Sequence, residues 1–64
     1  MTDEEEREDD RGARMLIFLQ NAHGLEESYD HAIASWRVFS EVERKQTRAA
    51  FKLFGGTAQN LEPR

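Results

Sequence analysis

The sequence predicts an all-α protein: a compact arrangement of three helices, with an acidic N-terminal tail and a short loose C-terminal tail. Two apolar patterns of helical period and one serine–glutamate capping pattern predict the helices, and glycines mark two of the helix ends. The pattern contains no strand candidate. At 64 residues the chain makes one small domain, and it has no cysteine for disulfides. Its stability therefore depends on good helix packing, on a partner chain, or on both.

An acidic tail precedes the first helix. Residues 1–10 hold seven acidic residues and one arginine, a net charge of −6, and residues 2–10 contain no apolar side chain. We expect a solvated tail or, at its distal end, the first turn of a helix, where the macrodipole favours carboxylates. From Ala13 onward the pattern is helical, and Gly24 is a natural stop. One face of this helix carries Met15, Phe18, Leu19 and Ala22.

Two further helices follow the first. The second is expected from Glu27 or Ser28 to Phe39, with an apolar face formed by Tyr29, Ala32, Ile33, Trp36 and Phe39. Ser40 and Glu43 form a capping box, so the third helix begins at Glu41 and ends at Phe54, before two glycines. Residues 56–64 show no periodicity and are expected to form a loose tail. The three-helix domain thus covers residues 11–55.

The third helix has two chemically different faces. A helical wheel places an apolar group toward the core: Val42, Ala49, Ala50, Leu53 and Phe54. The opposite side is basic, with Phe51 on its border. Together with Arg37, this side forms the predicted partner-binding set: Arg37, Arg44, Lys45, Arg48, Phe51 and Lys52. Two interpretations stay open, a face that binds protein or nucleic acid and an ordinary solvated face. The predicted core cluster contains Phe18, Ile33, Trp36, Phe39 and Leu53.

The second and third helices resemble part of the HMG box. That family runs its second helix into a tryptophan, an apolar residue, a serine and an acid–base pair, and this chain has Trp36, Phe39, Ser40, Glu43 and Arg44 at those positions. The resemblance covers about half of the chain and implies DNA bending by a wedge side chain. This chain begins with acidic residues, whereas an HMG box begins with a basic strand that contains proline.

Catalytic and metal sites are not expected. Glu27 and His31 share a helical face, but zinc requires three or four ligands from spaced elements. Ser28, Asp30 and His31 point in different directions from one helix, so they cannot form a triad. We therefore expect no catalytic residue, no metal, no cofactor and no small-molecule ligand. The longest apolar run, residues 15–19, is too short to cross a membrane, and the acidic N-terminus is unlike a signal peptide, so we expect a cytoplasmic protein.

The function that follows from these features is recognition by a surface. We predict a small non-enzymatic regulatory or adaptor protein that binds another protein. The alternative is a nucleic-acid-binding protein, HMG-box-like or helix-turn-helix-like, that uses the basic side of its third helix; the acidic tail disfavours it by repelling a polyanion. Leu16 and Ile17 lie off the apolar face of the first helix. They predict either a homodimer through that helix or contact with a different protein.

Overall fold

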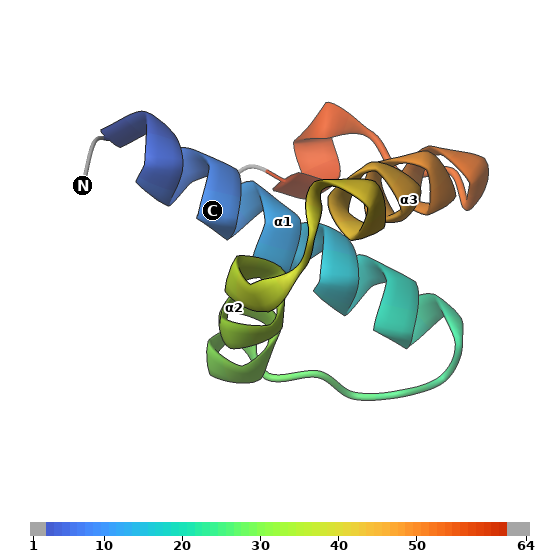
Figure 1. Ribbon diagram of the computed structural model, residues 1–64. Helices are drawn as coiled ribbons and strands as arrows, with labels where there is room; N and C mark the ends of the chain where they lie inside the picture. Colours follow the sequence, from blue (N-terminus) through green and yellow to red (C-terminus); the bar gives the residue numbers. More distant parts are fainter. Residues whose placement is uncertain (1–2, 62–64) are drawn as a thin grey trace.

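Three α-helices and a short 3-10 helix make up the fold (Figure 1), in a computed structural model that describes residues 3–61. The helices are α1 (Asp3–Ala22), α2 (Tyr29–Val38), α3 (Glu41–Leu53) and η1 (Ala58–Leu61), and no strand occurs in this range. The predicted all-α, three-helix class is therefore confirmed. The long helix α1 is central, since α2, α3 and η1 each pack against it.

Helix α1 begins much earlier than the apolar periodicity indicated. It starts at Asp3, so residues 3–10 are helical; of the two expectations, a solvated tail or the first turn of a helix at its distal end, the helix is the one found, and it is longer than one turn. Met1 and Thr2 lie outside the described residues. Carboxylates are favoured in the first turns of a helix by the macrodipole. Those further along, at Glu8, Asp9 and Asp10, form ion pairs with arginines of α1, α2 and α3. Periodicity cannot detect such pairing, which is why the start was misplaced.

Glycine ends both long helices, as predicted. Among the described residues, Gly24 and Gly55 are the two with positive φ, at 80° and 85°, a region that glycine enters without steric cost. After α1, the Leu25 N–H donates to the Gln20 carbonyl at 2.8 Å. After α3, the Gly56 N–H donates to the Phe51 carbonyl at 2.8 Å. Both bonds are the long hydrogen bond of a Schellman motif, which satisfies carbonyls that the helix leaves free.

Serines cap the N-terminal ends of α2 and α3. The Ser28 hydroxyl accepts from the His31 N–H and begins α2. At α3 the predicted capping box is complete: the Glu43 N–H donates to Ser40 Oγ at 3.2 Å, and the Ser40 N–H donates to Glu43 Oε1 at 2.9 Å. Phe39 and Ser40 both have extended backbone conformations. These two residues interrupt the helical path, and the chain changes direction sharply between α2 and α3.

The core is centred on Trp36, which is fully buried. Its indole lies directly against Gly12 of α1, where an added Cβ would come within 2.0 Å of the ring. Ala13 and Ala32 are also fully buried, so residues with small side chains lie in the core where Trp36 packs against α1. The ring of Phe51, 5% exposed, meets the ring of Phe18 edge-on at 5.0 Å.

The predicted core cluster is correct for α1 and α2 and wrong for α3. Trp36 is buried, and Phe18, Ile33 and Phe39 are partly buried. The Phe39 ring lies 6.2 Å from that of Trp36. Leu53, by contrast, is 85% exposed. The residue that fills its expected place is Phe51, because α3 is turned about its axis relative to the predicted orientation.

The end of the chain is more ordered than the expected loose tail at residues 56–64. Gly56 packs under the Phe51 ring, at a distance that leaves no room for a Cβ. Thr57 begins η1, with its N–H and its hydroxyl both donating to Asn60 Oδ1. The prediction is therefore wrong for residues 57–61, while residues 62–64 lie outside the described part of the chain. Within that part, no helix is long and apolar enough to cross a bilayer.

Candidate protein-binding face

Helix α3 packs against α1 through a mixed polar and aromatic face. Its innermost residues, with Thr47 and Phe51 buried and two arginines partly buried, are Arg44, Thr47, Arg48 and Phe51. They follow the spacing i, i+3, i+4, i+7, so they form one side of the helix. The Thr47 hydroxyl donates to the Glu43 carbonyl at 2.9 Å, which satisfies its buried oxygen. The predicted core side of α3 is therefore wrong, and the two arginines Arg44 and Arg48 of the basic side face inward.

Two arginines face inward because they stack on Trp36. The guanidinium carbons of Arg44 and Arg48 lie 5.1 and 5.6 Å from the centre of the indole. Arg44 Nη2 also donates to the Trp36 carbonyl at 3.2 Å. Arginine suits such a position because its planar group is weakly hydrated and stacks on aromatic faces. The indole thus lies against Gly12 of α1 and near two cations of α3.

A carboxylate from α1 compensates part of these two positive charges. Glu8 Oε1 lies 3.1 Å from Arg48 Nη2 and 3.7 Å from Arg44 Nη1. The Arg44 side chain is only 19% exposed, so solvent screens this charge less than it screens an ordinary surface cation. Part of the acidic segment therefore neutralises part of the basic side of α3 within one chain.

The next two carboxylates join α1 to α2. Asp9 pairs with Arg37 at 3.1 Å. Asp10 accepts from the Tyr29 hydroxyl at 2.7 Å and from Arg14 Nε at 2.9 Å. Burial alone would raise the pKa of Asp10, but the hydrogen bonds from Tyr29 and Arg14 outweigh it, so this pKa lies below its usual value. The same bond to Asp10 raises the pKa of the Tyr29 phenol.

These contacts divide the predicted partner-binding set. Arg37, Arg44 and Arg48 pair with carboxylates of the same chain, and Phe51 lies in the core. Lys45 and Lys52 are exposed, and neither forms an ion pair with another described residue. The basic side of α3 is therefore two separate features: an arginine pair that is used internally and a lysine pair that faces solvent.

The side of α3 that points away from α1 carries three exposed apolar residues. Val42 is 63% exposed and Leu53 is 85% exposed, and the smaller side chain of Ala49 is also exposed. These residues are separated by seven and four positions, so they fall within about 20° of one line along the helix. We call Val42, Ala49 and Leu53 the apolar strip. Sequence reasoning found the residues correctly but assigned them to the core.

The predicted oligomer face on α1 is largely covered. Leu16 and Ile17 are both half-buried, since α1 is packed on several sides by α2, α3 and η1. Met15, which belongs to the predicted apolar face of this helix, is buried. A homodimer through α1 stays a prediction, and the most exposed large apolar side chains of the described residues are Leu53 of α3 and Val38 of α2.

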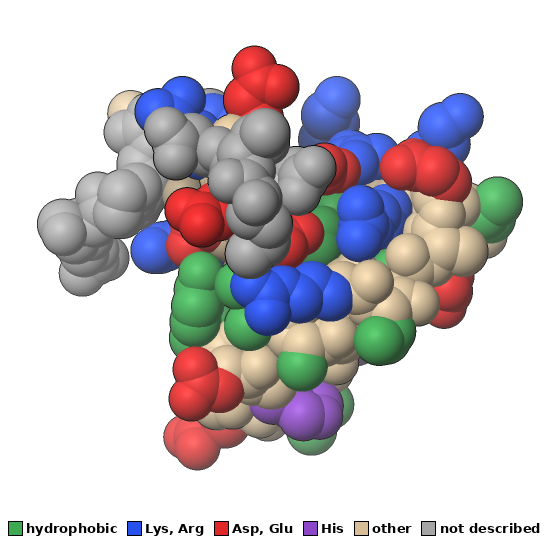
Figure 2. All heavy atoms as spheres, turned by 60° about the vertical axis from the view of Figure 1, so that its left-hand side comes forward, with side chains coloured by type: hydrophobic (Ala, Val, Ile, Leu, Met, Phe, Trp, Pro, Cys, Tyr) green, Lys and Arg blue, Asp and Glu red, His purple; other side chains and the backbone are tan. Residues whose placement is uncertain are grey.

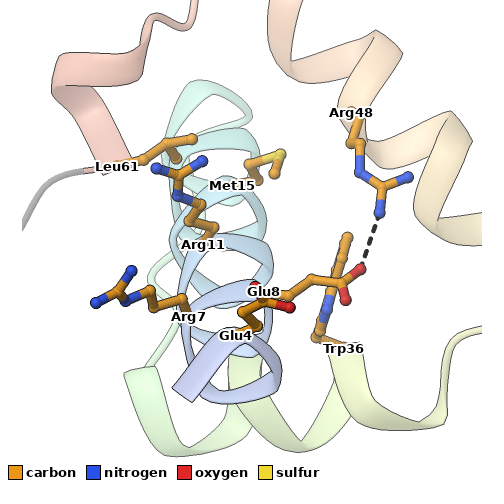
Figure 3. Close-up of a pocket in the computed structure, with 8 residues that line it drawn as sticks. All are labelled: Glu4, Arg7, Glu8, Arg11, Met15, Trp36, Arg48 and Leu61. Carbon is orange, nitrogen blue, oxygen red and sulfur yellow. Dashed lines mark hydrogen bonds and ion pairs between the residues drawn. The ribbon is translucent and has the colours of Figure 1, made fainter. Parts of the chain in front are cut away.

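A hollow of about 460 Å³ lies between α1, α3 and η1 (Figure 3). Its lining residues are Glu4, Arg7, Glu8, Arg11, Met15, Trp36, Arg48 and Leu61. Acidic and basic side chains alternate around it, and the Glu8–Arg48 pair spans one wall. Figure 2 shows the same mixture of charges on the surface. The indole Nε1 is buried with no hydrogen-bond partner in the described structure. With both signs present, the hollow offers no dominant charge to select an ionic ligand.

The histidines and Ser28 have local structural roles. His23 Nδ1 lies 2.8 Å from the Leu19 carbonyl, and its ring meets that of Phe54 at 5.3 Å. His31 pairs with Glu27, and the hydrogen bond lowers the pKa of that carboxyl. The Ser28 hydroxyl caps α2. Within residues 3–61, no three histidine or carboxylate side chains are grouped closely enough to hold a metal ion.

Comparison with known proteins found no matching family model, no matching curated protein and no matching solved structure.

Proposed function

We propose that this chain is a small non-enzymatic protein that acts by binding another protein, and that the apolar strip of α3 is its contact surface. The observation that carries the proposal is the orientation of α3. Its aliphatic side chains point to solvent, while its arginines pack inward. A single exposed leucine would require no explanation, but apolar residues aligned over about three turns of one helix are typical of an interaction surface.

The arginine contacts favour this function over nucleic-acid binding. Arg44 and Arg48, the cations that the alternative required, already share Glu8. Lys45 and Lys52 would leave about two phosphate contacts on α3, and two contacts give a log–log salt slope of only about −1.8 on duplex DNA. The apolar side chains of the strip between Val42 and Leu53 would contribute nothing to the affinity for a phosphate backbone.

The test is affinity capture from the native host with matched variants. The bait is the full chain as wild type, as Leu53→Glu and as Ala34→Glu. Ala34 is an exposed alanine of α2, so the last variant adds the same charge outside the strip. Each capture is run with and without nuclease, and each bait is first checked by circular dichroism.

We expect a protein that the wild type and Ala34→Glu retain equally, that Leu53→Glu loses, and that nuclease does not release. Retention that depends on nucleic acid would overturn the proposal in favour of the alternative. Retention that is equal for all three baits would show that the apolar strip is not the contact surface.

A further inference from the structure

We infer that the partner presents an amphipathic helix with acidic residues along one flank, and that it lies lengthwise on the apolar strip with its acids against Lys45 and Lys52. The inference rests on the proposed function and names the partner chemistry of the same face. Three features of α3 carry it: the shape of the strip, the charges beside the strip, and the pairing of Arg44 and Arg48 with Glu8 within the chain.

The shape of the strip suits one helix. Its three residues span eleven positions, which is about 17 Å along the axis. The strip is one residue wide at each level. Between Val42 and Ala49, the residue nearest to the line of the strip is the exposed Gln46. Helices that dock on such a surface use apolar anchors at every third or fourth residue. An extended strand would need unpaired backbone groups on the receiving side, and a helix offers none along its length.

The charge beside the strip lies on one flank. Lys45 and Lys52 follow the same edge seven residues apart, about 10 Å along the axis, and both are exposed. On the opposite edge stand Ala50 and Glu43, whose carboxylate accepts from the Ser40 N–H. The exposed Glu41 stands on the lysine edge, four residues before Lys45, so this edge carries a net charge of +1 and its two lysines are the positive charges that a partner meets there. Two acids seven residues apart on one edge of a partner helix match these lysines.

A second copy of this chain does not fit these features. In an antiparallel pair of α3 helices the same edge of each helix meets, so two edges that each carry two lysines and one glutamate, a net charge of +1, would face each other. In a parallel pair the lysines would face the edge with Glu43, which already serves the capping box. The acidic segment of another copy has the right charge, but residues 2–10 contain no apolar side chain to occupy the strip. The features fit a different protein better.

Designed peptides test the inference on the full chain. The probe is a fluorescein-labelled helical peptide of eighteen residues with leucines at alternate three- and four-residue spacing. Two glutamates seven residues apart lie beside its leucine face. The control peptide carries lysines in place of those glutamates. Affinities are measured by fluorescence anisotropy against the wild type, Leu53→Glu and the double variant Lys45→Glu/Lys52→Glu.

We expect the wild type to bind the glutamate peptide about tenfold more tightly than the lysine peptide. We expect the lysine-to-glutamate double variant to reverse this order, and Leu53→Glu to weaken both peptides. If both peptides bind the wild type equally and Leu53→Glu abolishes both, the acidic flank is wrong and the proposed face stands. If Leu53→Glu leaves binding of the glutamate peptide unchanged, the inference fails together with the face.

Two other outcomes would also overturn the inference. If neither peptide binds the wild type, a helical acidic partner is wrong, whereas the proposed function is still decided by the capture experiment. If sedimentation shows a wild-type dimer that Leu53→Glu converts to a monomer, the occupant of the strip is a second copy.

Discussion

Replacing Gly12 by alanine should destabilise the protein, against the expectation from helix propensity. Alanine is favoured over glycine inside a helix by about 0.5–1 kcal/mol. At this position, however, the new Cβ would lie 2.0 Å from Trp36 Cδ2 and 2.1 Å from Cε2, far inside van der Waals contact. The indole cannot move aside, because Arg44 and Arg48 stack near its ring and the residue is fully buried.

The magnitude follows from the two opposing effects. Overpacking a core costs about 1–3 kcal/mol, and displacing a buried tryptophan altogether costs about 3–5 kcal/mol. Because an approach of 2.0 Å is too close for small adjustments to relieve, the larger cost applies; after subtracting the propensity gain of about 0.5–1 kcal/mol, we expect a net loss of about 2–4 kcal/mol. At about 0.1 kcal/mol per residue, the whole domain has only about 6 kcal/mol of stability. With a urea m-value of about 1 kcal/mol/M, the midpoint should fall by about 2 M or more.

Urea unfolding followed by circular dichroism measures this effect. Asn21→Ala, at an exposed position of α1, serves as the control and should be neutral or stabilising, because it gains helix propensity without a clash. The double variant Gly12→Ala/Trp36→Leu should show a favourable coupling of about 0.5–3 kcal/mol, since removing the ring removes the overlap. A Gly12→Ala midpoint equal to or above that of the wild type would refute the packing of Trp36 on α1.

Three further predictions concern the core and the ion pairs. Trp36→Ala should lower the free energy of unfolding by about 3–5 kcal/mol in the same assay; a parent-like melt would contradict the helix pairing. Glu8→Gln should cost about 0.2–1 kcal/mol, and the difference from wild type should shrink at 1 M salt, where the Debye length is about 3 Å; a salt-independent difference would argue against the ion pairs. Tyr29→Phe removes the hydrogen bond that lowers the pKa of Asp10 and raises that of Tyr29. The stability linked to Asp10 is present above its unfolded pKa of about 4 and is lost as pH falls through the lower folded pKa. The stability linked to Tyr29 is present below its unfolded pKa of about 10 and is lost as pH rises through the higher folded pKa. The variant should therefore be less stable near neutral pH and approach the wild type at both extremes; a constant difference across pH would contradict this linkage.

The helix ends were predictable because their determinants are local. The capping box of Ser40 and Glu43 requires only the spacing of two residues, and the stops at Gly24 and Gly55 require only a residue that tolerates positive φ. Trp36 was also correctly assigned to the core, because its helix has one clear apolar face.

The start of α1 and the orientation of α3 depend on contacts between distant residues, which is why they were missed. Glu8 and Arg48 are forty positions apart, and neither adds to an apolar periodicity. A wheel also treats arginine as an outward residue, whereas Arg44 covers the indole with its planar group and remains charge-compensated. The candidate binding face followed from this error: the side assigned to the core is the exposed one.

The cover over Leu16 and Ile17 was missed for a related reason. Leu16 and Ile17 lie off the main apolar face, and one wheel cannot show that a helix is covered on several sides. The C-terminal segment adds η1 to the neighbours of α1 through Gly56, which needs the absence of a Cβ under Phe51. Only the tertiary arrangement reveals that requirement.

The orientation of α3 underlies both the proposed face and its partner, and the stability of Leu53→Glu tests it most directly. Because Leu53 is 85% exposed, the variant should unfold in urea within about 0.5 kcal/mol of the wild type, whereas Phe51→Ala should lose about 3–5 kcal/mol. If Leu53→Glu unfolds the protein and Phe51→Ala is tolerated, Leu53 belongs to the core, α3 has the opposite orientation, and the apolar strip does not exist as a surface.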